Sequence, residues 1–262
     1  MTVNFTVTVN SPGSGTPSGN VTVSDGAASC TASVAAGTCN LKLKVAGTRT
    51  LTATYAGYAN FNSSSDTESH QVNSRTASFR SQGAYNGWLL ESGENSNAGG
   101  SINATATTFI MGDDVANKQY RTILSFNTAN LPDSAVITKV TLKIRKQGLV
   151  GTNPFTTHGN ILVDVRKGAF GGSNALQLTD FQAAASKNAA GTIKNTPSSG
   201  WYPVTFNSSA FTYINLTGMT QFRLRFQLDD NDDLGADYLK FYSGNYSSVS
   251  LHPLLVIEYY VP

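Results

Sequence analysis

The most concentrated group of chemically capable side chains lies near the C-terminal end of the chain. Five carboxylates stand within the nine residues from Asp229 to Asp237, and they repel one another unless a cation or solvent screens them. Oxygen ligands at alternating positions are what Ca²⁺ prefers. We therefore predict a structural calcium site formed by Asp229, Asn231, Asp233 and Asp237.

The acidic run begins like an EF-hand loop and then departs from one. An EF-hand has Gly at its sixth position and Glu at its twelfth, whereas this run has Leu234 and Lys240 there. A calcium site must then be a loop site completed from elsewhere, by Glu91 or Glu94, or by Asp113 and Asp114. The alternative interpretation is a solvated acidic turn between two strands.

Other reactive residue types are scattered rather than convergent. Adjacent residues on a strand point to opposite faces, so Asp113 and Asp114 cannot easily flank one glycosidic bond. His70, His158 and His252 lie far apart, without metal-ligand spacing. No Gly-x-Ser-x-Gly or His-Glu-x-x-His motif occurs. We predict no catalytic residues and no enzymatic activity.

Aromatic residues beside turn residues indicate a possible sugar-binding surface, because flat rings can stack on sugar faces. The ligand-binding residues that we predict are Tyr85, Trp88, Tyr242 and Tyr246. Trp201 and Tyr202 are weaker candidates of the same kind. The alternative is that these rings belong to the core or rim of a β-sandwich.

Two cysteines occur, Cys30 and Cys39, and Ala35-Ala36-Gly37 between them is typical of a hairpin tip. Two thiols placed symmetrically about a turn favour a disulfide over two free cysteines. Such a bond implies an oxidising compartment, and we therefore expect an extracellular or cell-surface location.

Composition favours an extracellular all-β protein. Charged residues make up 13% of the 262 residues, and the net charge is +2, without a basic stripe. A nucleic-acid partner is therefore not expected. No apolar run has the length of a membrane span.

Alternation with period two predicts strands along the whole chain. The first segment has strand candidates at residues 2–9, 20–24, 28–34, 38–45, 48–55 and 67–72. The second has candidates at residues 76–80, 86–91, 101–111, 119–126, 136–146, 160–167, 201–206, 221–228, 237–243 and 252–261. Helical signal is confined to residues 180–185. We predict two β-sandwich domains, residues 1–73 and 74–262.

The segments GNVTVSDG (residues 19–26) and LKLKVAGTRTLTATYAGYANF (residues 41–61) resemble bacterial immunoglobulin-like repeats. The resemblance implies a small sandwich that serves as a spacer or adhesion module. Such repeats usually carry one more strand upstream of residues 2–9, so it also implies a domain that lacks its first strand.

A second resemblance covers nearly all of residues 75–262. It rests on YRTILSFN (residues 120–127), Leu131-Pro132, AVITKVTL (residues 135–142), GWYPV (residues 200–204) and HPLLVIEY (residues 252–259). These segments are similar to the DNRLRE-type β-sandwich, although the letters DNRLRE do not occur. The resemblance implies a larger, jelly-roll-like antiparallel sandwich like that of a carbohydrate-binding module. Such modules accompany secreted hydrolases and surface proteins.

We therefore expect a non-catalytic extracellular module pair for adhesion, or for attachment to polysaccharide or another cell-surface component. One alternative is a structural subunit of a filament or surface layer that self-associates through its incomplete Ig-like domain by β-strand complementation. Another is the C-terminal targeting region of a secreted hydrolase.

Overall fold

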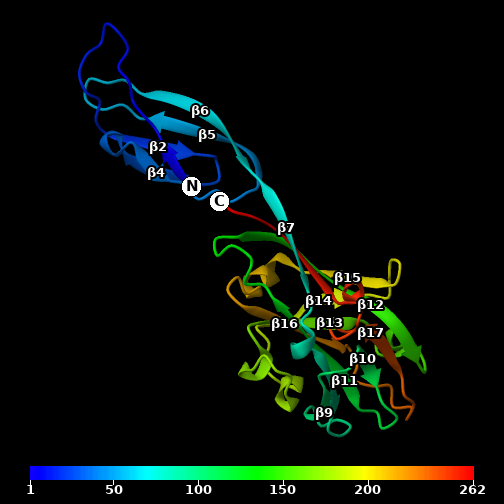
Figure 1. Ribbon diagram of the computed structural model, residues 1–262. Coiled ribbons are helices and arrows are strands. Elements are labelled where there is room, and N and C mark those ends of the chain that lie inside the picture. Colours follow the sequence, from blue (N-terminus) through cyan, green and yellow to red (C-terminus); the bar gives the residue numbers. More distant parts are fainter. The chain divides into compact units, whose positions relative to one another are not determined.

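The computed structural model describes all residues from 1 to 262, and the chain is all-β, with 47% of residues in strands and 10% in helices (Figure 1). It divides into two compact units. Unit 1 comprises Met1–Arg75, Ser134–Val136 and Tyr260–Pro262, and unit 2 comprises Thr76–Asp133 and Ile137–Tyr259. The fold class predicted from the sequence is confirmed. No helix in the structure is long and apolar enough to cross a membrane.

Unit 1 is a small sandwich of two antiparallel sheets. A four-stranded sheet has the order β3-β2-β5-β6, and a two-stranded sheet joins β1 to β4. The strands are β1 (Thr2–Asn4), β2 (Asn20–Ser24), β3 (Ser29–Ser33), β4 (Thr38–Asn40), β5 (Gly47–Tyr55) and β6 (Ser64–Val72).

The core of unit 1 follows the alternation in the sequence. Val21, Val23, Leu51 and Tyr55 point inward from β2 and β5 and are buried. Their outward neighbours are threonines and other uncharged polar residues, as expected for sheets with one solvated face. The Tyr55 hydroxyl donates to the Ser18 carbonyl at 2.7 Å, so this large side chain is buried with its polar end satisfied.

Two strands of unit 1 are shorter than predicted. The strand expected over residues 2–9 pairs only as β1, although burial continues to alternate as far as Val9. The strand expected over residues 38–45 likewise ends at Asn40, yet Leu41 and Leu43 are still buried. The hydrophobic alternation therefore identified the inward-facing residues correctly, even in the parts of residues 2–9 and 38–45 that are not assigned to a strand.

The disulfide between Cys30 and Cys39 is present, as predicted. The expected hairpin tip is a short 3₁₀ helix, Val34–Ala36, which ends at Gly37 with φ of 65°. Cys30 lies on β3 and Cys39 on β4, and these strands belong to different sheets. The bond therefore ties the two layers of the sandwich together.

Unit 2 is built on one curled twelve-stranded sheet. Its main path is β14-β13-β16-β11-β10-β17-β12-β18-β7, with β8 and β9 attached at β11, and β15 at β12. The first strands are β7 (Ser74–Arg80), β8 (Gly87–Glu91), β9 (Gly99–Asn103), β10 (Thr108–Asp113), β11 (Gln119–Asn127) and β12 (Val136–Val150). The others are β13 (Ile161–Lys167), β14 (Lys187–Ile193), β15 (Trp201–Thr205), β16 (Met219–Phe226), β17 (Tyr238–Tyr242) and β18 (Leu254–Tyr260).

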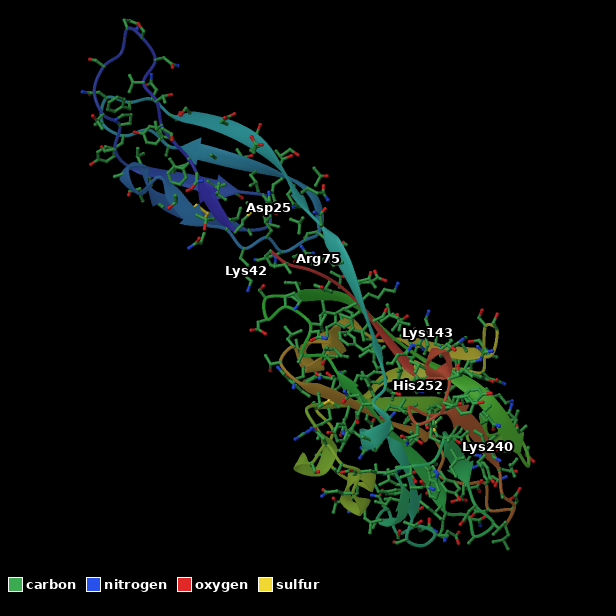
Figure 2. All side chains as sticks on the ribbon, in the orientation of Figure 1. Asp25, Lys42, Arg75, Lys143, Lys240 and His252 are labelled. Carbon is green, nitrogen blue, oxygen red and sulfur yellow. A yellow bond between two sulfur atoms is a disulfide. The ribbon has the colours of Figure 1, made fainter.

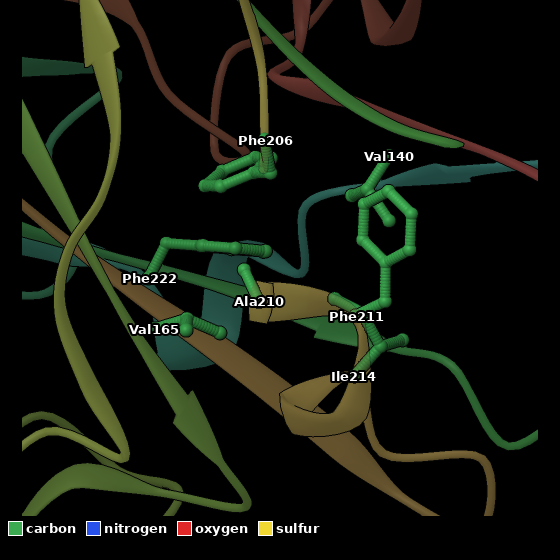
Figure 3. A pocket seen from close by; sticks show the side chains of 7 residues that line it. All are labelled: Val140, Val165, Phe206, Ala210, Phe211, Ile214 and Phe222. Atoms are coloured by element: carbon green, nitrogen blue, oxygen red, sulfur yellow. The ribbon is translucent and has the colours of Figure 1, made fainter. Parts of the chain in front are cut away.

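Apolar side chains fill the inside of the curled sheet. Figure 3 shows one part of this core, where Phe206, just after β15, lies against Phe222 of β16, and a small gap remains beside them. The gap has no room for a water molecule and is lined only by apolar side chains. It is an ordinary packing feature of the core and offers no group for catalysis or polar recognition.

The sequence missed one strand, β14, and misplaced two other features. The β14 sequence, KNAAGTI, has few β-formers, but Gly191 permits close packing, since a Cβ there would lie 2.7 Å from Val204 Cγ2. The single strand expected over residues 101–111 is interrupted after Asn103, which gives β9 and β10. The helical signal at residues 180–185 corresponds to a 3₁₀ helix at Leu178–Phe181.

Candidate functional site

The acidic loop connects β16 to β17, and it gathers three of the four predicted calcium ligands. The Asn231 amide Nδ2 donates to Asp233 Oδ2 at 2.8 Å and to Asp237 Oδ2 at 3.3 Å. Asp237 is 3% exposed, and its other oxygen accepts from the Thr152 backbone N–H. Asp229 is exposed and makes no side-chain hydrogen bond within this group.

Asp113, the last residue of β10, contacts this loop. Its Oδ1 accepts from the Asp237 backbone N–H at 3.3 Å and lies 3.2 Å from His158 Nε2. Asp113 and His158 are both fully buried, and Asp113 Oδ2 has no hydrogen-bond partner. The carboxylate is therefore held by the loop backbone, and the His158 imidazole lies beside it without forming a hydrogen bond through Nε2.

Two of the other residues proposed to complete the calcium site have different roles. Glu91 accepts from the backbone N–H groups of Asn97 and Gln119. Asp114 caps the turn after β10 by accepting from the N–H groups of Ala116 and Lys118. Both carboxylates are thus occupied in shaping turns.

A second cluster of carboxylates includes residues of the acidic loop. Oxygens of Glu94, Asp230 and Asp232 all lie within 4.8 Å of one another. Burial and the neighbouring charges of Asp229 and Asp232 raise the pKa of Asp230. The loop therefore directs Asn231, Asp233 and Asp237 toward one another, and Asp230 and Asp232 toward Glu94.

Trp88 belongs to a cluster of half-buried rings that spans neighbouring strands. The Tyr120 ring lies 5.4 Å from Trp88 and 5.8 Å from Tyr238, edge to face in both cases. Burial, with smaller contributions from Asp114 and Tyr238, raises the pKa of Tyr120 to about 12, so its phenol stays protonated. Sequence reasoning missed Tyr120 and Tyr238, whose proximity depends on strand register.

Tyr242 and Tyr246 form a separate pair, with ring centroids 4.5 Å apart. The His252 ring nitrogen Nε2 lies 2.6 Å from the Tyr246 carbonyl and so holds the turn that carries this ring. Figure 2 labels His252 and Lys240, whose ammonium lies 5.9 Å from the Tyr238 ring. The predicted residues Tyr242 and Tyr246 are therefore brought together, at the opposite end of β17 from Tyr238.

Tyr85 is separate from both aromatic groups, although only two residues lie between it and Trp88. It ends a short 3₁₀ helix, Gly83–Tyr85, and its carbonyl accepts from the Ser125 hydroxyl at 2.7 Å. It lines an open groove together with uncharged side chains. The weaker candidate Tyr202 is buried in the core, where its ring stacks on Phe155 at 5.6 Å.

Residues 168–186 form a covering segment, in which Phe170 and Phe181 pack on Leu89 of β8 and Ile123 of β11. Arg223 fastens this segment by donating to the carbonyls of Asp180, Phe181 and Ala183, while also pairing with Asp164 at 2.8 Å.

Arg121 provides a second attachment for the covering segment. It donates to the Phe181 carbonyl at 2.7 Å, and its guanidinium lies 3.9 Å from the centre of the Phe181 ring. Burial, together with Arg223 and Arg225, lowers the pKa of Arg121 to about 10, so it remains a cation at neutral pH.

Asp180 is a buried carboxylate within the covering segment. Its Oδ2 accepts from the Gln177 N–H at 2.9 Å, and its Oδ1 has no partner. Burial raises its pKa to about 6, against the opposing effects of the Gln177 N–H and Arg223.

Comparison with known families matches one part of the chain. The family described as Bacterial Ig-like domain (group 3) matches residues 1–73, which agrees with the Ig-like sandwich of unit 1. No curated protein matches the chain. The N-terminal unit is thus similar to a bacterial Ig-like domain.

Replacing Asp180 by Asn should stabilise unit 2 at pH 7.5 by about 2–3 kcal/mol, because the folded protein holds a carboxyl whose pKa of about 6 exceeds the reference value of 3.8. The folded state binds the proton more tightly, so this group's contribution to stability falls as the pH rises from about 4 to about 6. The variant should lack that fall. Urea unfolding followed by tryptophan fluorescence reports on unit 2, which contains both tryptophans.

The exposed carboxylate Asp133 provides the matched control, Asp133→Asn, which should leave the pH profile unchanged. An Asp180→Asn variant whose stability falls across this pH range as steeply as that of the wild type would contradict the assignment.

Proposed function

We propose that the chain is a non-catalytic, extracellular pair of β-modules that attaches to polysaccharide or another cell-surface component through unit 2. The Ig-like unit 1 acts as a spacer, and the disulfide suits an oxidising compartment. Unit 2 is proposed to be a DNRLRE-type sandwich. In support, the β11 residues Leu124 and Phe126, which carry part of that resemblance, point into its core.

The observation that carries the proposal is the gathering of half-exposed rings over β8, β11 and β17. Tyr120 lies against both Trp88 and Tyr238, and Tyr242 and Tyr246 form a second aromatic pair at the other end of β17. Aromatic side chains supply large apolar contact area at low entropic cost. Rings of this kind, left partly open to solvent, suit contact with the apolar faces of sugars.

The surroundings of Asp113 and Asp114 favour a binding role over glycoside hydrolysis. Glycoside hydrolysis needs two carboxyl groups that face each other across a bond. Asp113 is buried against His158 and the loop backbone, and Asp114 pairs with Lys118 at 3.4 Å while capping a turn. Each carboxylate already has a structural partner.

Trp88→Ala and Tyr242→Ala should each weaken retention on immobilised polysaccharides by about tenfold, as expected for loss of an aromatic contact at an interface. Tyr58→Ala, which removes a 59% exposed ring of unit 1, is the matched control and should bind as the wild type does. Pull-down on a broad panel of insoluble polysaccharides gives the measurement. A wild-type protein that binds none of them would refute the proposal.

A structural Ca²⁺ is proposed for the acidic loop, held by Asn231, Asp233 and Asp237. In the structure, the Asn231 N–H₂ group lies between the two carboxylates, and Asn231 Oδ1 is buried without a partner. Rotating the amide by half a turn would place three oxygens together, which is the ligand chemistry that Ca²⁺ prefers. A bound Ca²⁺ would screen the repulsion between the carboxylates of the acidic loop.

Addition of about 1 mM Ca²⁺, the affinity range of extracellular modules, should raise the Tm of unit 2 relative to EDTA. Asp233→Asn should abolish the increase. Asp229→Asn, which removes an exposed carboxylate outside the group, should retain it. Loss of the increase in Asp232→Asn instead would place the ion at Glu94, Asp230 and Asp232. A Tm that is the same in Ca²⁺ and in EDTA would contradict calcium binding at either site.

Strand complementation is a second candidate function, favoured by an open groove of about 550 Å³ in unit 1. β1 pairs only with β4 and β6 only with β5, and the groove runs between their free edges above Val23 and Leu51. Such edges accept added strands.

Light scattering across a concentration series should then give multiples of the 27.7 kDa chain mass. Thr67→Lys and Ser69→Lys, at exposed positions on the edge strand β6, should restore the monomer, because charged side chains on an edge strand disfavour pairing with another strand. A wild-type protein that is monomeric at every concentration would exclude self-complementation.

A further inference from the structure

A second candidate binding site lies at the opposite end of β11 from Tyr120. An open groove of about 570 Å³ runs between the loops that follow Ser81, Asn127 and Asn215, and its lining contains no Asp, Glu, Lys, Arg or His. The polar side chains that line it are all uncharged, and Tyr85 is its one aromatic residue. This volume falls within the usual range of small-molecule sites.

The amides in the groove have fixed orientations. Asn127 Oδ1 accepts the Ala129 backbone N–H at 3.1 Å, and Asn215 Oδ1 accepts the Thr217 backbone N–H at 3.2 Å. These contacts decide which end of each amide is the oxygen, because a backbone N–H needs an acceptor. Each Nδ2 group is left without a partner in the fold and is available as a donor to a ligand.

The groove also offers a ring. Tyr85 is half-buried at the groove wall. Gln82 lines the same wall, but its Oε1 is buried and is not available to a ligand. Amide donors and one aromatic ring are groups that recognise a molecule with alternating hydroxyls and apolar C–H faces.

Buried polar contacts hold these walls in place. Gln221 is 1% exposed, and its Nε2 donates to Ser125 Oγ at 2.9 Å and to the Asn174 carbonyl at 3.2 Å. Ser125 Oγ in turn donates to the Tyr85 carbonyl at 2.7 Å. One cross-strand pair, Ser125 and Gln221, therefore fixes the Tyr85 wall relative to the Asn174 wall.

The Asn215 wall is fixed in the same way. The fully buried hydroxyl of Thr128 lies at hydrogen-bonding distance from the Asn215 and Gly218 carbonyls, and 2.9 Å from Thr220 Oγ1. The Thr220 hydroxyl also accepts the Asn215 backbone N–H at 2.9 Å. A groove that is rigid before binding loses little entropy when a ligand enters.

We propose that this groove binds an uncharged, hydroxyl-rich glycan and discriminates against acidic glycans. The inference rests on the proposed function, which supplies polysaccharide as the partner of unit 2, and it adds a second site and the ligand class. Sugar hydroxyls can accept hydrogen bonds from the free Nδ2 groups of Asn127 and Asn215. An ionised carboxylate would lose water in a groove that contains no cation to compensate it.

Isothermal titration with two sets of probes tests the ligand class. The neutral probes are dextran, mixed-linkage β-glucan and galactomannan, and the acidic probes are alginate and polygalacturonate. The wild type should bind at least one neutral probe at least tenfold more tightly than either acidic probe. Preference for an acidic probe overturns the inference.

Three groove variants test the site. Asn127→Asp and Asn215→Asp keep the oxygens that accept the backbone N–H groups, but they replace each free donor with a negative charge. Each should weaken binding of the neutral probe about tenfold, and Tyr85→Ala should do the same. The control is Asn188→Asp, an exposed site on β14, which should bind as the wild type does. Circular dichroism confirms that each variant is folded.

The outcomes separate this inference from the proposed function. Binding that is lost in Trp88→Ala or Tyr242→Ala but unchanged in all three groove variants overturns the groove and leaves polysaccharide attachment standing. Binding that is lost in the groove variants supports the groove. A wild type that binds neither neutral nor acidic probes overturns both.

Discussion

The buried guanidinium of Arg223 is the interaction on which the loop face of unit 2 depends. It pairs with Asp164 on the neighbouring strand β13 and donates to three backbone carbonyls of the covering segment, those of Asp180, Phe181 and Ala183. A buried cation that loses its partners is strongly destabilising, so the backbone of the covering segment is held at these carbonyls. The same segment carries Gly168 and Asn174 to the groove beside Tyr85.

Polar residues inside unit 2 act mainly as connections between loops. Four buried polar residues lie on the adjacent strands β11 and β16 or directly after β11, and their side chains form hydrogen bonds with backbone groups of the connecting segments: Ser125, Thr128, Thr220 and Gln221. Hydrogen bonds of this kind compensate the cost of burying polar atoms. The apolar interior of the curled sheet provides cohesion, and these few polar contacts give the irregular segments around it defined conformations.

Period-two alternation was sufficient to find most strands, and it failed where packing overrides propensity. β5 was predicted because Thr, Leu, Ala and Tyr alternate through it, whereas β14 was missed because Gly191 is required by the closeness of Val204 and Phe206. The site depends on register, which the sequence does not reveal. Tyr85 and Trp88 are close in sequence but belong to different surfaces, while Tyr120 and Tyr238 meet across strands. The calcium prediction included Asp229, which stands apart from Asn231, Asp233 and Asp237.

The bond between Cys30 and Cys39 has a mechanical consequence for unit 1. It closes a loop across a separation of nine residues and connects one layer of the sandwich to the other. If the chain is stretched from its ends, this loop cannot lengthen the polypeptide while the bond is intact. About 30 Å of contour length, at roughly 3.5 Å per residue, is withheld from extension. Thiol exchange would release that length, so the maximum extension of a stretched chain containing this unit would depend on the redox state of its surroundings.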